Sequence, residues 1–394
     1  MSADGGDANE GKTADAGSEM IVTPAFGRVA DKAMELIEQA HGGALCVYRD
    51  GEPVIDVWAG PRDPSSGSPW QHDTMGMGWS TTKGIASTAL HMLADRGELD
   101  LAKPVATYWP EFAAEGKDRV TVEQVLAMEA GLYDIRHLIV DPHTMLDHDA
   151  MASALAGARP RHEPGTACAY HALTYGWLVG ELVRRITGNT LGAFVQTEIA
   201  EPLGLDGCYI GTPSDQLARV AARPKLPPEN AVVRRLAKIA DPIFSLGGLS
   251  PERIASAFAP RGGYDVIPTD EFLEAEVPSA NGVFTARSLA RIYASLGRDD
   301  GLDGVRLWSP ETRRRATQRR KRGRDLVLAF PIRWQLGYHP PFPRRSVSRS
   351  AFGFYGAYGS GAYADPERGL AVGLVVRDAQ RLPLPKLVKL LGRA

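Results

Sequence analysis

Ser80 and Lys83 are the residues whose types and spacing point most directly to chemistry in this chain. Residues three apart lie on one face of a helix, so the hydroxyl and the amine can come within hydrogen-bond reach. A serine hydroxyl is a weak nucleophile at neutral pH and needs a neighbour that takes its proton. A lysine can do this when burial lowers its pKa and leaves the amine neutral. The pair therefore predicts nucleophilic catalysis by Ser80.

The surrounding sequence predicts a helix that begins at Ser80 and ends near Gly97. Its apolar residues recur at helical spacing and predict an amphipathic helix; they are Ile85, Leu90, Met92 and Leu93. The preceding residues 75–79 are apolar, which places Ser80 at the buried lip of a cleft. Backbone N–H groups at the helix start favour the negative charge that develops in acyl transfer.

Tyr170 is the second candidate. It follows the stretch Glu163–Thr166 and precedes His171 and a predicted helix over 172–186. A desolvated tyrosine beside a lysine can pass a proton between the nucleophile and the leaving group. The alternative is a core tyrosine with a satisfied hydroxyl. His171 also has two interpretations: it adds polarity to the site, or it has a structural role.

A glycine-rich stretch over 352–360 is the third element. Such a strand packs a core poorly, but it lets the backbone approach a ligand closely and point a free N–H at an oxyanion.

Two predicted hairpins frame the chain. Strand-like runs over 44–48 and 53–58 flank a turn at Asp50-Gly51, and runs over 361–364 and 370–376 flank a second turn. The sequence between them is mostly helical. We therefore predict an α+β fold in residues 21–394, with one antiparallel β-sheet flanked by helices. An all-helical lobe is inserted at about 100–220, and residues at about 223–269 form a candidate lid.

The composition argues against several other classes of protein. The 45 basic and 47 acidic residues give a formal net charge of −2, so no bulk attraction to nucleic acid follows. Residues 1–20 resemble a disordered acidic tail without a secretory signal. No apolar run is long enough for stable membrane insertion, and a cytoplasmic location is predicted. The three cysteines form neither a disulfide framework nor a zinc site.

Two clusters of charged residues are not predicted to be functional sites. The basic run 313–324 has no interleaved aromatic residues and is interpreted as a solvated helix and loop. His143 and His148 lie five residues apart, which does not place both on one helical face, so no metal site is predicted. No cofactor is implied, and the oligomeric state stays open.

The order of these motifs resembles the serine β-lactamase and penicillin-binding-protein superfamily, and within it the class C-like esterases called family VIII carboxylesterases. The resemblance covers about residues 24–390. Three further stretches support it, namely 121–132, 201–205 and 279–283.

The resemblance implies a role for each motif. Ser80 is the acylated nucleophile, Lys83 its base partner and Tyr170 the second proton carrier. The oxyanion hole consists of the backbone N–H groups of Ser80 and Ala357. Residues expected to contact substrate are Trp79, His171, Phe354, Tyr355 and Gly356, the last three standing where β-lactamases carry Lys-Thr-Gly.

Two departures from the family pattern concern the substrate. Phe354 replaces a lysine or histidine that would hold a substrate carboxylate. Ala172 replaces the asparagine of Tyr-x-Asn, so an amide that would bond a substrate amide is missing. Both changes favour an uncharged small-molecule ester as the expected partner, and hence a serine carboxylesterase. Short- to medium-chain esters are the expected size. The alternatives are an acyltransferase, a D-aminopeptidase or a weak β-lactamase using the same residues, or a catalytically silent binding protein.

Overall fold

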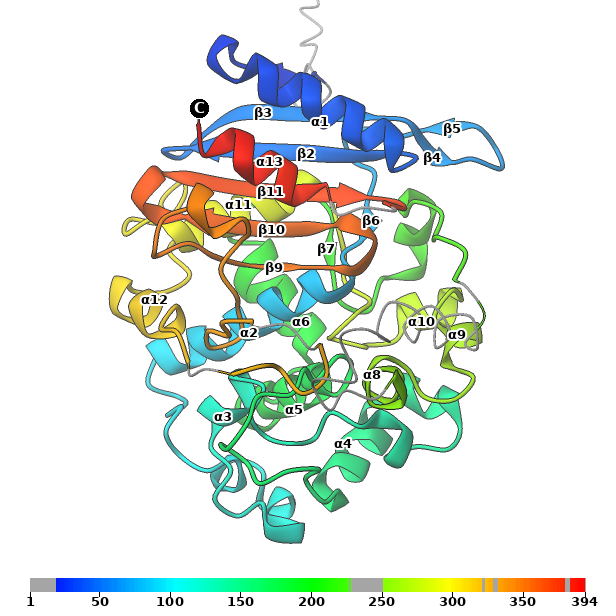
Figure 1. The fold of residues 1–394 in the computed structure, drawn as a ribbon, viewed down its shortest axis with the longest axis vertical. Helices are drawn as coiled ribbons and strands as arrows, with labels where there is room; N and C mark the ends of the chain where they lie inside the picture. Colours follow the sequence, from blue (N-terminus) through cyan, green and yellow to red (C-terminus); the bar gives the residue numbers. More distant parts are fainter. Residues whose placement is uncertain are drawn as a thin grey trace, which may run out of the picture.

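A six-stranded antiparallel sheet joins the two ends of the chain (Figure 1). The computed structural model describes residues 19–226, 228, 251–320, 323–328, 332–379 and 383–393. The strand order is β1 (Ile21–Val22), β3 (Glu52–Ala59), β2 (Gly43–Arg49), β11 (Leu370–Val376), β10 (Gly361–Asp365) and β9 (Phe352–Tyr355). Both predicted hairpins are confirmed, and β2 and β11 join them, with Val47 opposite Val372.

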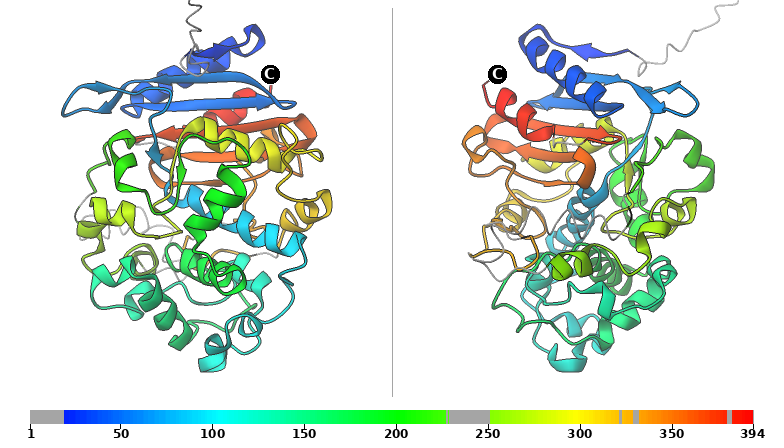
Figure 2. Two further views of the ribbon diagram at one scale, coloured as in Figure 1. Left: turned by 180° about the vertical axis from the view of Figure 1, so that it is seen from behind. Right: turned by 45° about the vertical axis from the view of Figure 1, so that its right-hand side comes forward.

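Side chains of the central strands point alternately to the two faces of the sheet, and each face packs into a separate core. Leu45 and Val47 face a core shared with α1 (Gly27–Gln39) and α13 (Leu384–Leu391). Ala44 and Cys46 face the opposite core, which α11 (Ala286–Gly297) covers. Successive strand residues point to opposite faces, so both faces are buried under helices. Figure 2 shows the sheet from behind, with α11 across that face.

Short helices and turns occupy the region predicted as a helical lobe. They include α3 (Val122–Leu126), α4 (His148–Gly157), α5 (Thr174–Thr187) and α6 (Leu191–Val195). A small sheet has the strand order β6 (Gly76–Met77), β8 (Val283–Phe284) and β7 (Cys208–Tyr209). The predicted α+β class is thereby confirmed. Because β7 lies inside the predicted lobe, the expectation that this lobe is all-helical was wrong.

The remaining elements lie at the margins of these layers. They are β4 (Pro61–Asp63), β5 (Ser68–Pro69), α8 (Pro251–Phe258), α9 (Gly263–Val266), α10 (Asp270–Glu274) and α12 (Pro310–Ala316). Of the candidate lid, residues 227 and 229–250 lie outside the described residues, as do residues 1–18 of the predicted tail. None of the helices in the described part of the chain is long and apolar enough to cross a membrane.

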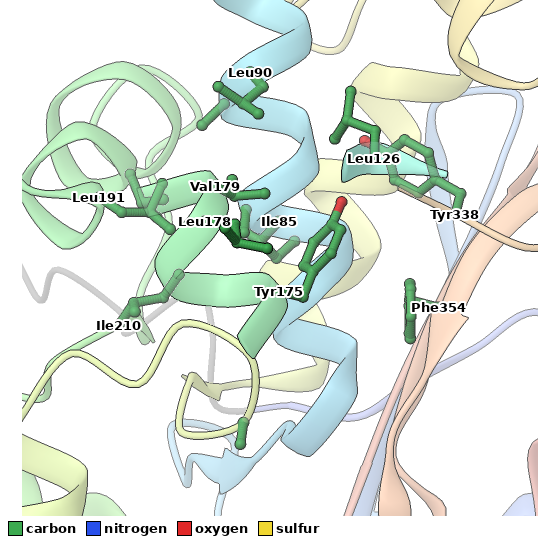
Figure 3. Packing of buried hydrophobic residues seen from close by; sticks show 14 of the residues in the cluster. Ile85, Leu90, Leu126, Tyr175, Leu178, Val179, Leu191, Ile210, Tyr338 and Phe354 are labelled. Carbon is green, nitrogen blue, oxygen red and sulfur yellow. The ribbon is translucent and has the colours of Figure 1, made fainter. Parts of the chain in front are cut away.

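The helix that follows Ser80 differs from its prediction. A 3-10 turn, Trp79–Thr81, leads into α2 (Thr82–Asp95), and residues 82–93 are buried on every side rather than on one face. Figure 3 shows α2 between α5, which carries Leu178 and Val179, and β9, which carries Phe354. The amphipathic interpretation was wrong because three polar residues of α2 form hydrogen bonds inside the protein and are buried with the apolar ones. Ser87 bonds Tyr175, Thr88 bonds Tyr338, and His91 bonds the Leu336 carbonyl.

Gly84 allows α2 to pack closely against α11 and β9. A Cβ at position 84 would lie 2.4 Å from the Tyr293 hydroxyl of α11 and 3.4 Å from Phe354 Cβ. The Tyr293 hydroxyl is buried and has no hydrogen-bond partner among the described residues. The absence of a side chain at 84 therefore sets the separation between α2 and the helix that covers the sheet.

We expect Gly84→Ala to destabilise the protein by about 1–3 kcal/mol, because overpacking against Tyr293 outweighs the gain in helix propensity. Tyr293→Phe removes the clashing oxygen and should restore stability in the double variant. Urea unfolding of the wild type, both single variants and the double variant measures this coupling. A double variant as unstable as the sum of the two singles would contradict the assignment.

Candidate active site

Ser80 lies in the 3-10 turn between β6 and α2. The preceding residue, Trp79, has a φ of +50°, a backbone conformation uncommon for a large side chain. Its ring packs on Tyr358 with centroids 4.8 Å apart, and the Thr81 N–H bonds the Gly78 carbonyl. These contacts hold the strained turn and leave Ser80 partly exposed, whereas Lys83 is fully buried.

Lys83 Nζ is held by three oxygen atoms. It donates to the carbonyl oxygens of Ala172 at 2.7 Å and Ser279 at 2.9 Å, and it lies 3.1 Å from Ser80 Oγ. A neutral amine has two N–H groups and one lone pair. With both N–H groups bound to the carbonyls, the lone pair is left to accept the Ser80 proton.

The electrostatic setting favours that neutral form. Burial lowers the pKa of Lys83 well below the ordinary lysine value. Within the described residues, no carboxylate lies within ion-pair distance of the Lys83 ammonium to oppose this effect. Lys83 can therefore act as a base at neutral pH.

Tyr170 completes the hydrogen-bonded group around Ser80. Its hydroxyl donates to Ser80 Oγ at 2.6 Å, and its ring centroid lies 5.0 Å from Lys83 Nζ. The ring stacks on Trp334 at 5.5 Å with an interplanar angle of 10°, and Phe258 of α8 contacts it from another direction. Burial raises the pKa of Tyr170, so the phenol stays protonated and available as a donor. The structure thus brings Ser80, Lys83 and Tyr170 together.

Asp325 orients Tyr170 and was missed by the sequence analysis. Its buried carboxylate accepts the backbone N–H of Tyr170 at 3.1 Å and the Trp334 indole N–H at 2.9 Å. Two further N–H groups, from Val327 and Leu328, bond the same carboxylate. Burial nevertheless raises the pKa of Asp325. No sequence signal marks this residue, which directly follows the basic run.

Gly356 brings the end of β9 against the start of α2. A Cβ there would lie 2.2 Å from the Gly78 carbonyl oxygen and 3.1 Å from Trp79 Cβ, so only glycine fits. In the described part of the chain, the backbone N–H groups of Ser80 and Ala357 have no hydrogen-bond partner. The two N–H groups predicted as oxyanion donors are therefore free in the described part of the chain.

Trp79 and Phe354 lie beside the catalytic group but are largely covered. Trp79 is 8% exposed and Phe354 is 2% exposed. The Phe354 ring lies 5.9 Å from Lys83 Nζ and packs against Trp334. Phe354 therefore forms an apolar wall behind Lys83 and offers little surface to a substrate.

Tyr355 and His171 are corrections to the predicted substrate-binding set. Tyr355 follows Phe354 in β9 and so points to the opposite face of the sheet, where it packs with the core of α1 and α13. The His171 ring is fully buried, accepts the Leu132 N–H at 3.0 Å and lies 2.7 Å from the Ala169 carbonyl oxygen. Both of its nitrogen atoms bond backbone groups, so the structural interpretation holds.

The residues of the two charged clusters form separate ion pairs. Arg320 of the basic run pairs with Glu123 and Glu129, and Arg313 pairs with Asp299. Residues 321 and 322 lie outside the described residues. His143 pairs with its neighbour Asp141, whereas His148 bonds Glu181, so the two histidines have separate partners.

Comparison with known proteins identifies the family. Residues 28–389 match the sequence model described as Beta-lactamase, so the chain belongs to the beta-lactamase family. It is 41% identical over 342 residues to Esterase/beta-lactamase LipL of Mycobacterium tuberculosis (strain ATCC 25618 / H37Rv), covering 85% of this chain and 76% of that protein.

Solved structures share the fold along the whole chain. One described as a family VIII carboxylesterase has a TM-score of 0.83 and 30% identity, covering 95% of this chain and 99% of that one. A penicillin-binding protein homolog from Caulobacter crescentus has a TM-score of 0.79 and 34% identity, covering 94% and 97%. The predicted β-lactamase/transpeptidase-like fold is thereby confirmed.

We expect Asp325→Asn to lower both stability and turnover. The amide can still accept the three backbone N–H groups, but its NH₂ faces the Trp334 indole N–H, leaving two buried donors opposed at a cost of about 1–3 kcal/mol. Urea unfolding and the rate of ester hydrolysis measure the effect. Asp300→Asn, at an exposed aspartate, is the matched control. Equal behaviour of the two variants would contradict an orienting role for Asp325.

Proposed function

We propose that this protein is a serine hydrolase that cleaves carboxylic esters through an acyl-enzyme on Ser80. The observation that carries the proposal is the position of Ser80 Oγ, 3.1 Å from Lys83 Nζ and 2.6 Å from the Tyr170 hydroxyl. The names of the relatives support it, since they include an esterase/beta-lactamase and a family VIII carboxylesterase.

In the proposed acylation step, Ser80 Oγ attacks the ester carbonyl while its proton passes to the Lys83 amine. The developing oxyanion accepts hydrogen bonds from the N–H groups of Ser80 and Ala357. The C–O bond to the alcohol then breaks. Tyr170 donates its proton to the departing alkoxide and is reprotonated from the Lys83 ammonium, so the alcohol leaves neutral.

In the proposed deacylation step, a water molecule attacks the acyl-enzyme carbonyl and transfers a proton through Tyr170 and Lys83 to Ser80 Oγ. The acid is released, and the hydrogen-bonded group returns to its first state. Each proton carrier is oriented by buried contacts, Lys83 by two carbonyl groups and Tyr170 by Asp325 and Trp334.

The proposed substrate has no charge next to its scissile bond. Phe354 supplies no cation beside Lys83, and Ala172 contributes its carbonyl to Lys83 rather than a side-chain amide to substrate. Short- to medium-chain acyl groups are the proposed size, since the partly exposed rings of Tyr358 and Phe258 offer nearby apolar surface. Acyl transfer, D-aminopeptidase activity and weak β-lactamase activity remain the alternatives, and the name of the LipL relative favours the last of these.

We expect the wild type to release p-nitrophenol from p-nitrophenyl butyrate and to use nitrocefin poorly. Ser80→Ala should abolish ester turnover and remove the acyl adduct seen by intact-protein mass spectrometry, while circular dichroism remains unchanged. Substantial activity in Ser80→Ala would overturn the assignment. Rapid nitrocefin turnover would show that Phe354 does not exclude β-lactams.

The pH dependence should report the base form of Lys83. Because burial lowers the pKa of Lys83 and raises that of Tyr170, kcat/KM should rise with pH to a plateau reached below the ordinary lysine range. Lys83→Arg leaves a permanent cation and should reduce kcat/KM by at least about 10³.

Lys103→Arg, at an exposed lysine, is the matched control for this measurement. The rate of Ser80→Ala is subtracted at each pH to remove spontaneous hydrolysis. An unchanged profile in Lys83→Arg would show that another group is the base.

A further inference from the structure

A cavity of about 860 Å³ lies where the loop after α3 meets α8. Its lining is rich in arginine, with five guanidinium groups from three separate parts of the chain: Arg136, Arg159, Arg161, Arg253 and Arg261. The motifs of the catalytic group do not predict this cluster, which forms only when residues 133–137, 159–161 and 252–261 come together.

The charges of the cavity are unbalanced. Among the described residues that line the cavity, five guanidinium groups outnumber two carboxylates, from Asp134 and Glu252. The Asp134 carboxylate is already engaged, at 3.1 Å by His137 and at 3.4 Å by Arg161. Among the described residues, the side chains of Arg159, Arg253 and Arg261 have no acidic partner.

Arg161 already binds the Asp134 carboxylate, and the guanidinium groups of Arg159, Arg253 and Arg261 are available for a carboxylate from a ligand. The planar fork of arginine matches a carboxylate through paired hydrogen bonds. Guanidinium groups of like charge repel one another, and an anion among them relieves that repulsion. The ligand chemistry that fits is a carboxylate on a flexible organic chain.

Two ring contacts relate the cavity to the surroundings of Tyr170. Tyr133 lines the cavity and packs edge-on against His171, with ring centroids 6.5 Å apart, and His171 directly follows Tyr170. On the other side, α8 contributes Arg253 to the cavity and Phe258 to the ring of Tyr170. A ligand in the cavity is thus next to the residues that surround the proton carrier.

We propose that the cavity is a subsite for a carboxylate carried by the ester substrate at the end remote from its scissile bond. This inference rests on the proposed esterase function and refines its substrate class. The apolar wall at Phe354 keeps charge away from the carbonyl, whereas the arginine cavity receives charge further along the acyl chain. The preferred substrates are then hemi-esters of dicarboxylic acids.

The test compares p-nitrophenyl hemi-esters of glutaric, adipic and suberic acid with the same compounds capped as methyl esters at the far carboxyl. Within each pair the acyl chain is the same, and the distal carboxyl is either charged or a neutral methyl ester. We expect wild-type kcat/KM to be at least about tenfold higher for one hemi-ester than for its capped partner, and this ratio to fall with added salt.

Arg253→Gln and Arg261→Gln should each reduce that selectivity ratio about tenfold. Arg261 is exposed, so its variant keeps the test valid if Arg253→Gln unfolds. Arg345→Gln, at an exposed arginine outside the cavity lining, is the matched control and should leave the ratio unchanged. Calorimetric titration with glutarate should show binding to the wild type and weaker binding to both cavity variants.

The two proposals fail in different ways. Hydrolysis of capped and charged esters at equal rates, with equal ratios in every variant, overturns the subsite and leaves the esterase function standing. Absence of hydrolysis for all esters overturns the esterase function. Glutarate binding that is equal in the wild type and both cavity variants, or absent from all three, overturns the subsite whatever the activity.

Discussion

The structure depends on how one buried amine is held. The carbonyl groups of Ala172 and Ser279 bind Lys83 Nζ, and those residues precede α5 and β8, far from α2 in the sequence. Because the two carbonyls take the N–H groups of the neutral amine, its lone pair is directed at Ser80. Three segments must therefore meet before the serine has a base, and the sheet and the helical region serve to bring them together.

A second set of contacts fixes the remaining proton carrier. Asp325 bonds both the backbone of Tyr170 and the indole of Trp334, and the indole stacks on the phenol. Two glycines complete the arrangement because they have no side chain. Gly84 lets α2 approach α11, and Gly356 lets β9 reach the turn before Ser80. Ser80, Lys83 and Tyr170 are thus positioned by packing as much as by hydrogen bonds.

Charge is distributed unevenly around Ser80, Lys83 and Tyr170. Phe354 presents an apolar ring to Lys83, and the depressed pKa of Lys83 depends on that low polarity. The arginine cavity beyond Tyr133 and α8 carries an excess of positive charge. If the cations lay as close to Lys83 as Phe354 does, they would also bind anions at the nucleophile. Separation by aromatic residues allows a neutral reaction centre and a charged subsite in one protein.

The sequence by itself determined the reactive pair, the two hairpins and the family, because Ser80 and Lys83 are a local motif and hairpins depend on neighbouring residues. Tertiary structure decided the rest. The burial of α2, the packing of Tyr355 in the core of α1 and α13 and the backbone bonds of His171 depend on segments distant in the sequence. Asp325 and the arginine cavity had no sequence signal, since their partners are distant in the chain. Local periodicity reports one face of an element, whereas the environment of a buried polar group is set by segments that only folding brings together.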